Sequence, residues 1–213
     1  MSETIQRLPL FYLPNAQYFS LLLMGNVEID QCEHYQKRSF RNRCHIATSH
    51  GELLLLVPLL KGKHEQQPIK EVRIDDSQRW QTQHWRSLQI AYGSAPFWEH
   101  YADALRPLYE KASGAFLFDY AERVLQTLMR LLQVPAYGYN SHFAPYTEAE
   151  KELYRRLEPR HRADFAAASY TQTFADRLPF LPNLSVVDLL FCLGAASARS
   201  YLLRCADGNK VQP

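Results

Sequence analysis

Two short apolar runs enclose a helical pattern within the first thirty residues, and this order constrains the fold more than any other feature of the chain. Residues 8–13 are apolar and end in a turn signal, which indicates a buried strand. Residues 16–24 have apolar side chains at helical spacing, with Asn15 placed to cap them and Gly25 to end them. Residues 27–30 indicate a second short strand. Strand, helix and strand in this order predict the start of an α/β unit.

Further strands are predicted in the first half of the chain. Residues 52–60 form an apolar run too continuous to alternate, which indicates a strand buried on both faces. Residues 41–48 precede it across a short turn and are expected to be its hairpin partner. Residues 69–74 alternate imperfectly and could form another strand, and the polar residues 61–68 before them are expected to be a mobile loop.

The second half has apolar positions at spacings of three and four, as helices do. We expect helices over residues 77–92, 97–111 and 116–132. Residues 135–145 are short and aromatic, which is typical of a connection rather than a domain boundary.

Two cap signals place further helices near the C-terminus. Thr147 with Glu150 forms a capping box for a helix that ends near residue 157. Ser185 with Asp188 resembles one before residues 186–193, and Gly194 is expected to end that helix before a last one over 195–204. We therefore expect one domain over residues 1–213 with an α/β fold: a mixed sheet built largely from the N-terminal half, packed by helices, and a helical C-terminal half.

Composition excludes several classes of protein. With 213 residues, 46% apolar and 22% charged, the chain is long enough for one sizeable globular core. A net charge of +2 is too small for a nucleic-acid-binding protein. Neither a signal peptide nor a run of roughly 18 apolar residues is visible, so we expect no membrane span and a cytoplasmic protein. The four cysteines match no zinc pattern and are expected to be reduced and mostly buried.

The most distinctive local segment is residues 35–43 (YQKRSFRNR). It holds four cations and no acid, and the nearest carboxylates lie upstream at Asp30 and Glu33. Arg side chains bind carboxylate or phosphate bidentately, and amide side chains recognise donors and acceptors on sugars or bases. The candidate ligand-binding residues in this segment are Tyr35, Gln36, Lys37, Arg38, Asn42 and Arg43.

Two interpretations of residues 35–43 stay open. If the segment is extended, Lys37, Arg41 and Arg43 share one face, and that face could bind an anion. Alternatively, the segment is a solvated edge strand whose cations prevent self-association.

The order of motifs along nearly the whole chain resembles the WbqC-like family. The matching segments are 10–14 (LFYLP) with 17–19 (QYF), the basic segment 35–43, 51–58, Trp80 with His84, 91–97 (AYGSAPF) with Tyr101, 170–174 (YTQTF) and 183–190 (NLSVVDLL). The chain departs from the family pattern at its first motif, where a Gln-Pro pair usually precedes the Tyr and Leu10 and Phe11 stand here. The resemblance implies bacterial O-antigen or other surface-polysaccharide gene clusters, and glycine transferases that decorate sugars have been suggested within the family.

His84 is the candidate general base, because a helix would place it on one face with Trp80 and Tyr92. A packing role is the alternative. Tyr92 and Gln172 are further candidate ligand contacts, and Asp188 is a candidate base or amine-orienting group, with a helix-terminus carboxylate as its alternative.

Other kinds of site have no signal in this sequence. No pair of histidines lies at i, i+4, so no metal site is predicted. Neither a glycine-rich phosphate loop nor a G-x-S-x-G motif is present. The sequence identifies neither a cofactor nor an oligomeric state.

The leading hypothesis is a transferase that adds a glycyl or similar small acyl group to an activated sugar. Its partner would be a small anionic or sugar-nucleotide ligand. The alternative is a non-catalytic protein that binds an anion through residues 35–43. A third hypothesis notes that the opening strand, turn and helix resemble nucleotidyltransferase-like folds, although their histidine signature is lacking. An enzyme should bring His84 or Asp188 close to residues 35–43 in a concave site.

Overall fold

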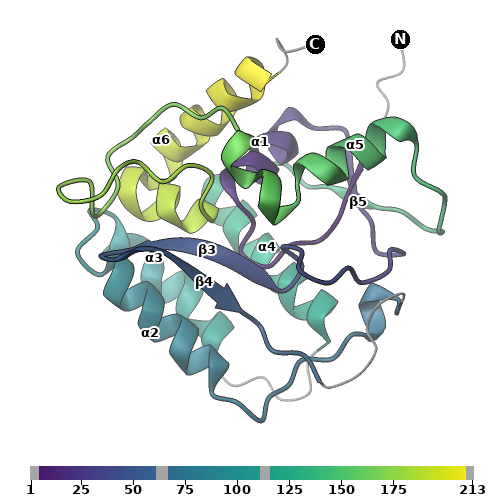
Figure 1. Ribbon diagram of the computed structural model, residues 1–213, viewed down its shortest axis with the longest axis horizontal. Helices are drawn as coiled ribbons and strands as arrows, with labels where there is room; N and C mark the ends of the chain where they lie inside the picture. The colour runs from purple at the N-terminus through teal and green to yellow at the C-terminus, as the bar shows by residue number, and fades with distance from the viewer. Residues whose placement is uncertain (1–4, 61–66, 111–115, 210–213) are drawn as a thin grey trace.

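The computed structural model describes residues 5–60, 67–110 and 116–209 and has an α/β architecture (Figure 1). One small sheet has the order β1 (Gln6–Leu8), β2 (Val27–Ile29), β5 (Gly138–Tyr139), with both pairs parallel. The other sheet is the antiparallel hairpin of β3 (Arg43–Thr48) and β4 (Gly51–Leu56). Helices fill most of the remaining chain, so the predicted fold class is confirmed.

The opening strand, helix and strand form a parallel unit as predicted. Helix α1 (Ala16–Met24) connects β1 to β2, and the Asn15 side chain accepts a hydrogen bond from the backbone N–H of Tyr18 at 3.0 Å. Gly25 ends the helix with φ 77°, which suits glycine. The strand is displaced from its predicted place, because β1 ends at Leu8 and the following residues 9–13 run as irregular buried chain toward the helix.

The hairpin of β3 and β4 is confirmed, but burial of β4 on both faces is wrong. Leu54 and Leu56 are 44% and 43% exposed, whereas Leu55 between them is buried. Only one face of the hairpin packs on the core. Residues 69–74 are a second correction: Ile69–Glu71 is a 3-10 helix, η1, and the chain after it makes only isolated bridges. Residues 61–66 of the predicted loop lie outside the described residues.

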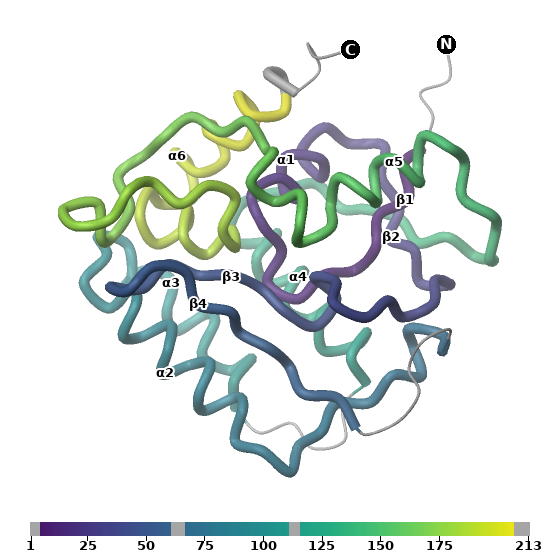
Figure 2. The backbone as a smooth tube through the Cα atoms, in the orientation of Figure 1, coloured from purple at the N-terminus to yellow at the C-terminus, as the bar shows by residue number. Residues whose placement is uncertain are grey.

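The predicted helices are confirmed with shifted ends. They are α2 (Trp80–Tyr92), α3 (Trp98–Leu105) continued by the 3-10 helix η2 (Arg106–Tyr109), and α4 (Leu117–Leu132). Helix α5 (Glu148–Arg156) has the expected capping box between Thr147 and Glu150, and the 3-10 helix η3 (Pro159–Asp164) follows it. Figure 2 shows α2 and α3 on one side of the β3–β4 hairpin and α5 on the other.

Helix α6 (Val186–Asn209) is interrupted at Gly194, where φ is 73° and ψ is 163°. The predicted break is therefore confirmed. A Cβ at Gly194 would lie 2.7 Å from the Phe97 ring, so the close approach also requires glycine. Within the described residues, α6 is the one helix long and apolar enough to cross a membrane, but 61% of that segment is buried inside the protein. This burial is consistent with the core helix of a soluble protein; the cytoplasmic location stays a prediction.

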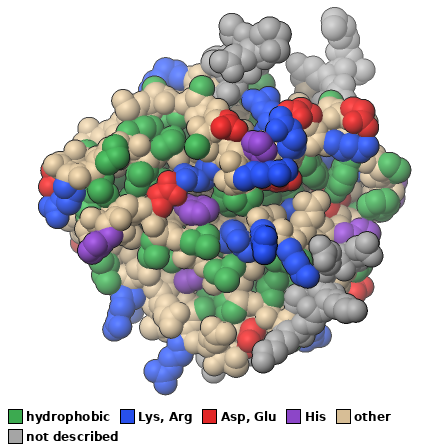
Figure 3. Space-filling view, in the orientation of Figure 1, with side chains coloured by type: hydrophobic (Ala, Val, Ile, Leu, Met, Phe, Trp, Pro, Cys, Tyr) green, Lys and Arg blue, Asp and Glu red, His purple; other side chains and the backbone are tan. Residues whose placement is uncertain are grey.

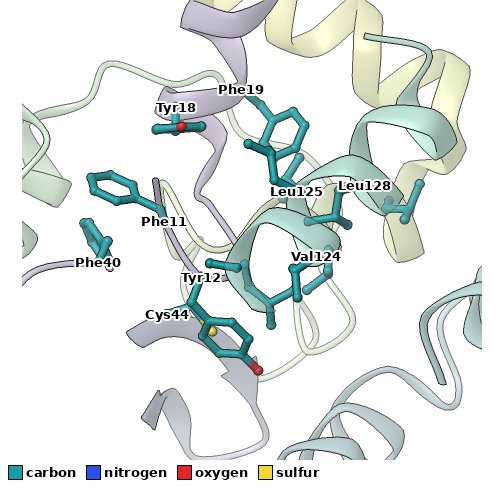
Figure 4. Packing of buried hydrophobic residues seen from close by; sticks show 14 of the residues in the cluster. Phe11, Tyr12, Tyr18, Phe19, Phe40, Cys44, Val124, Leu125 and Leu128 are labelled. Atoms are coloured by element: carbon teal, nitrogen blue, oxygen red, sulfur yellow. The ribbon is translucent and has the colours of Figure 1, made fainter. Parts of the chain in front are cut away.

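The core joins the beginning and the end of the described chain. Helix α1 packs along α6, and backbone hydrogen bonds join Ala16 N–H to the Leu184 carbonyl and Val186 N–H to the Pro14 carbonyl at 3.1 and 2.8 Å. Figure 4 shows Phe19 beside Leu125 of α4, and Tyr12 next to Cys44 of β3. The site described below lies on the outer face of that hairpin.

Candidate functional site

The basic segment divides into a buried part and an exposed part. Arg41 is only 2% exposed, and its guanidinium binds both carboxylate oxygens of Glu33, with Nε 2.9 Å from Oε1. Burial opposes the charge of Arg41, but the neighbouring Glu33 carboxylate raises its pKa above the ordinary value. Residues 35–43 contain no acid, but Glu33, eight positions before Arg41, thus neutralises one of their four cations.

Tyr35 and Asn42 also bind within the protein. The Tyr35 hydroxyl donates to Asn42 Oδ1 at 3.1 Å, and Asn42 Nδ2 donates to the Val57 carbonyl at 2.9 Å. Both side chains are buried. These contacts hold residues 35–42 against the end of the hairpin, and a ligand contact by either residue stays a prediction.

Residues 36–38 form an exposed turn. Arg38 has φ 57°, so the segment is not extended, and the predicted shared face of Lys37, Arg41 and Arg43 is wrong. The left-handed residue lies at the boundary between the exposed residues 36–38 and the buried residues 39–42, which include Arg41. Gln36, Lys37 and Arg38 remain exposed beside the hairpin.

The outer face of β3 displays Arg43 and His45, because alternate residues of a strand share a face. Their directly paired residues on β4 are Leu56 and Leu54. The Phe40 ring packs edge-on against the His45 imidazole at 5.9 Å. The half-buried Arg43 and His45 thus lie on one face of β3, and the buried Phe40 ring packs against the imidazole.

Arg162 of η3 and Glu52 of β4 complete this arrangement. Arg162 Nη2 contacts both carboxylate oxygens of Glu52 at 2.5 Å, and its Nη1 donates to the Pro182 carbonyl at 2.7 Å. We call Arg43, His45, Glu52 and Arg162 the front site. Figure 3 shows Lys, Arg and His side chains among hydrophobic ones on the face that carries the hairpin.

The electrostatic environment of His45 is cationic. Burial lowers its pKa, and the positive charges of Arg162 and Arg43 lower it further, while Glu52 opposes them. The imidazole is therefore neutral at neutral pH. His45 Nδ1 and Arg43 Nε are buried atoms without a hydrogen-bond partner among the described residues.

Asp188 gathers three residues behind β3. Its carboxylate accepts hydrogen bonds from the Tyr92 hydroxyl at 2.9 Å, from Gln172 Nε2 at 3.1 Å and from the Tyr170 hydroxyl. Burial raises the pKa of Asp188, and these hydrogen bonds oppose the shift. Asp188 thus binds side chains rather than serving only its own helix terminus. The predicted residues Tyr92, Gln172 and Asp188 are brought together.

A cavity of about 130 Å³ adjoins this group. Ala47, Tyr170, Gln172 and Phe180 are among its lining residues. Ala47 follows His45 on the same face of β3, and its backbone N–H donates to the Tyr92 hydroxyl at 3.2 Å. The outer face of β3 therefore leads from the front site toward the cavity.

His84 lies in the interior, on α2. Its Nδ1 is 2.9 Å from the Tyr12 hydroxyl, and the Trp80 ring packs edge-on against it at 5.2 Å. Burial lowers the pKa of His84 to about 4, and a hydrogen bond to the Leu56 carbonyl opposes the shift. Among the described residues, neither a hydrogen bond nor a ring contact joins His84 to residues 35–43. The catalytic role of His84 stays a prediction.

Sequence reasoning missed His45, Glu52 and Arg162 as site residues. The alternation of Arg43 and His45 in a predicted strand is a signal that could have found His45. Arg162 lies more than a hundred positions away and has no local signal. Within residues 5–60, 67–110 and 116–209, the structure contains no group of three His, Cys, Asp or Glu side chains that could hold a metal ion.

One family model matches most of the chain. The model of the WbqC-like protein family matches residues 11–164, which includes the front site but not Gln172 or Asp188. A relative in Mycobacterium tuberculosis, the uncharacterized protein Rv1507c, is 27% identical over 222 aligned positions, covering 91% of this chain and 95% of the relative. No solved structure matches the chain.

Proposed function

Because the chain belongs to the WbqC-like protein family, we propose that it is a transferase of bacterial surface-polysaccharide biosynthesis, of the O-antigen kind. It would add a glycyl or similar small acyl group to an activated sugar. The family resemblance supplies the pathway and the transferred group. The front site supports the proposal by its ability to hold an anion beside a neutral base.

The observation that carries the proposal is that the positive charges of Arg43, on β3, and Arg162, which binds Glu52 of β4, both act on His45. Guanidinium groups bind phosphate and carboxylate bidentately. Arg43 and Arg162 would hold the phosphates of a sugar nucleotide or of an activated donor. The exposed Gln36, Lys37 and Arg38 would contact the same ligand from the turn beside the strand.

The chemical step requires a base for the attacking group. A sugar hydroxyl or amine attacks the carbonyl carbon of the donor, its proton passes to a base, and the leaving group departs with the bonding electrons. His45 is neutral and its side chain is only half-buried, whereas His84 is fully buried, so we favour His45 over His84 as this base. His84 is neutral too, but its imidazole already binds Tyr12 and Leu56.

The cavity near Ala47 would receive the small group that is transferred. Its volume of about 130 Å³ fits a glycyl group rather than a large side chain. Gln172 and Tyr170 line it, and both are oriented by hydrogen bonds to Asp188. Asp188 is fully buried, so it would act as a positioning residue rather than as the base.

A second candidate function is anion binding without catalysis. Tyr35, Asn42, His84 and Asp188 all make hydrogen bonds inside the protein. The cations of the front site would then bind an anion without any of these residues taking part in a reaction.

Ligand binding tests the front site directly. Isothermal titration calorimetry with inorganic pyrophosphate and with UDP-N-acetylglucosamine should show a loss of about 2 kcal/mol for Arg43→Ala, because one bidentate contact is removed. Arg177→Ala is the matched control, since Arg177 pairs with its neighbour Asp176 on the surface. Equal affinities of Arg43→Ala and wild type for both probes would remove Arg43 from the site.

Catalysis is tested in a strain that lacks the gene and expresses each variant. Mass spectrometry of its hydrolysed surface glycan should show glycine with the wild type, and His45→Gln should lower the rate of incorporation by roughly 10² to 10⁴. His84→Gln should leave the rate of the folded protein unchanged. If the protein binds pyrophosphate but incorporation of an acyl group into the glycan does not depend on His45, the non-catalytic function is the correct one.

A further inference from the structure

We propose that a second cavity, between α1 and α5, binds a small aliphatic carboxylate that carries an additional oxygen acceptor, such as a medium-chain hydroxy acid. Its volume is about 350 Å³, at the lower end of the range for small-molecule sites. None of the four front-site residues lines it. The inference is therefore independent of the proposed transferase activity.

The walls of this cavity are apolar. Leu21 and Met24 come from α1, Leu153 from α5, and Phe165 from the chain that follows η3. No residue of α5 is fully buried, and Leu153, which packs at the edge of the core, also borders the cavity. An aliphatic chain in the cavity would remove apolar surface from water on both sides, which is the main driving force for binding in such sites.

Gln17 supplies a hydrogen-bond donor inside the cavity. Its side chain is 7% exposed, and its Oε1 accepts a hydrogen bond from Asn183 Nδ2 at 3.1 Å. Its Nε2 lacks a hydrogen-bond partner among the described residues, although Gln17 lines the cavity. An amide group that borders the cavity can donate to a ligand that carries an oxygen acceptor along its chain.

Arg156 supplies the cation for a carboxylate. It lines the cavity from the last turn of α5, and no hydrogen bond or ion pair engages its guanidinium within the described part of the chain. The nearby Glu152 is bound on both oxygens by Arg155, at 2.8 and 2.6 Å. Arg155 thus neutralises Glu152. The charge of Arg156 remains, so the lining is positively charged on this side and can attract an anionic ligand.

Titration calorimetry with three probes tests the chemistry: octanol, octanoate and 3-hydroxyoctanoate. Octanoate should bind more tightly than octanol because of Arg156, and 3-hydroxyoctanoate more tightly still because its hydroxyl oxygen accepts from Gln17. Equal affinity for octanol and octanoate would overturn the assignment of a carboxylate site. Absence of saturable binding by all three probes would overturn the site itself.

Variants locate the binding. Arg156→Gln should weaken octanoate binding about tenfold while leaving octanol unchanged, as expected for a partly exposed ion pair. Arg160→Gln is the control, because Arg160 pairs with Glu158 and neither residue lines the cavity, and it should bind octanoate as the wild type does. Ala149→Trp should fill the cavity and abolish binding of all probes, and thermal unfolding checks that each variant is folded. Undiminished octanoate binding by Ala149→Trp would place the ligand elsewhere.

Discussion

The two faces of the β3–β4 hairpin have opposite characters. Beneath the inner face, Cys44, Tyr12 and His84 are buried, and burial raises the pKa of the Cys44 thiol and lowers that of His84. On the outer face, Arg43 and His45 are half-buried, and each has a buried nitrogen without a partner among the described residues. One residue along the strand thus separates a fully buried side chain from one that is partly exposed.

The same contrast distinguishes Arg41 from Arg43, which lie two positions apart. Arg41 binds a buried carboxylate, whereas Arg43 is one of the front-site residues around His45. Residue type and proximity in sequence therefore do not assign a role; the partner of each polar atom does. Substitutions on the two faces should differ accordingly.

The largest difference is expected between Arg41→Ala and Arg43→Ala. Removing Arg41 leaves the Glu33 carboxylate buried without its cation, which should lower the free energy of unfolding by about 3 to 5 kcal/mol. Arg43→Ala should change it by less than about 0.5 kcal/mol. Urea denaturation measures both. The double variant Glu33→Leu, Arg41→Met should recover part of the loss, and similar stabilities for the two single variants would break the contrast.

The second prediction concerns acid and the two histidines. Unfolded histidine binds a proton near pH 6.5, but folded His84 does so only near pH 4. The unfolded state therefore binds more protons between these values, and stability present above pH 6.5 is lost as the pH falls. His84 alone should account for a loss of about 3 kcal/mol between pH 7 and pH 4.

The stability difference between wild type and His84→Gln isolates this contribution, because other titrating groups cancel. The difference should shift by about 3 kcal/mol in favour of the variant on going from pH 7 to pH 4. His45→Gln serves as the outer-face control and should shift less, since His45 is more exposed. A parallel pH dependence for wild type and His84→Gln would show that His84 is not held neutral.

The third prediction concerns the carboxylate behind the hairpin. Asp188→Asn replaces one acceptor oxygen with an N–H₂ group that faces the donors Tyr170 and Gln172, which should cost about 1 to 3 kcal/mol of stability. Asp176→Asn, at an exposed acid, is the control. Chemical denaturation compares them, and equal stabilities would argue that Asp188 is protonated and already donates a hydrogen bond.

The smallest effect is expected at the exposed leucines. Leu54→Ser on the outer face should change stability by less than about 0.5 kcal/mol. Leu55→Ser, one position along and buried, should destabilise the protein clearly in the same thermal-unfolding measurement. A large loss for Leu54→Ser would mean that another surface covers the outer face in solution.

Local signals predicted much of this fold. The caps at Asn15 and Thr147 and the break at Gly194 depend on a few neighbouring residues, so the sequence contains all that determines them. The turn signal predicted the hairpin. It did not predict that one face of the hairpin is exposed, because the exposure of Leu54 depends on whether another part of the chain packs over β4.

The site was less predictable because its contacts are distant in sequence. Arg41 pairs with Glu33 after a turn in which Arg38 is left-handed, and the sequence has no glycine at that position to signal the turn. Arg162 reaches the hairpin from η3 through Glu52, 110 positions away. Asp188 was predicted as a candidate, but its partner Tyr92 lies in a different helix.

The packing of α1 along α6 has a consequence for synthesis of the chain. The bridge between Asn15 and Ser185 joins positions that are 170 residues apart. At a translation rate of roughly 5 to 20 residues per second, α1 emerges from the ribosome about ten to thirty seconds before its partner helix exists. During that interval the apolar side of α1 lacks α6, the element against which it packs most extensively. The nascent chain should therefore be a client for chaperones until α6 is made.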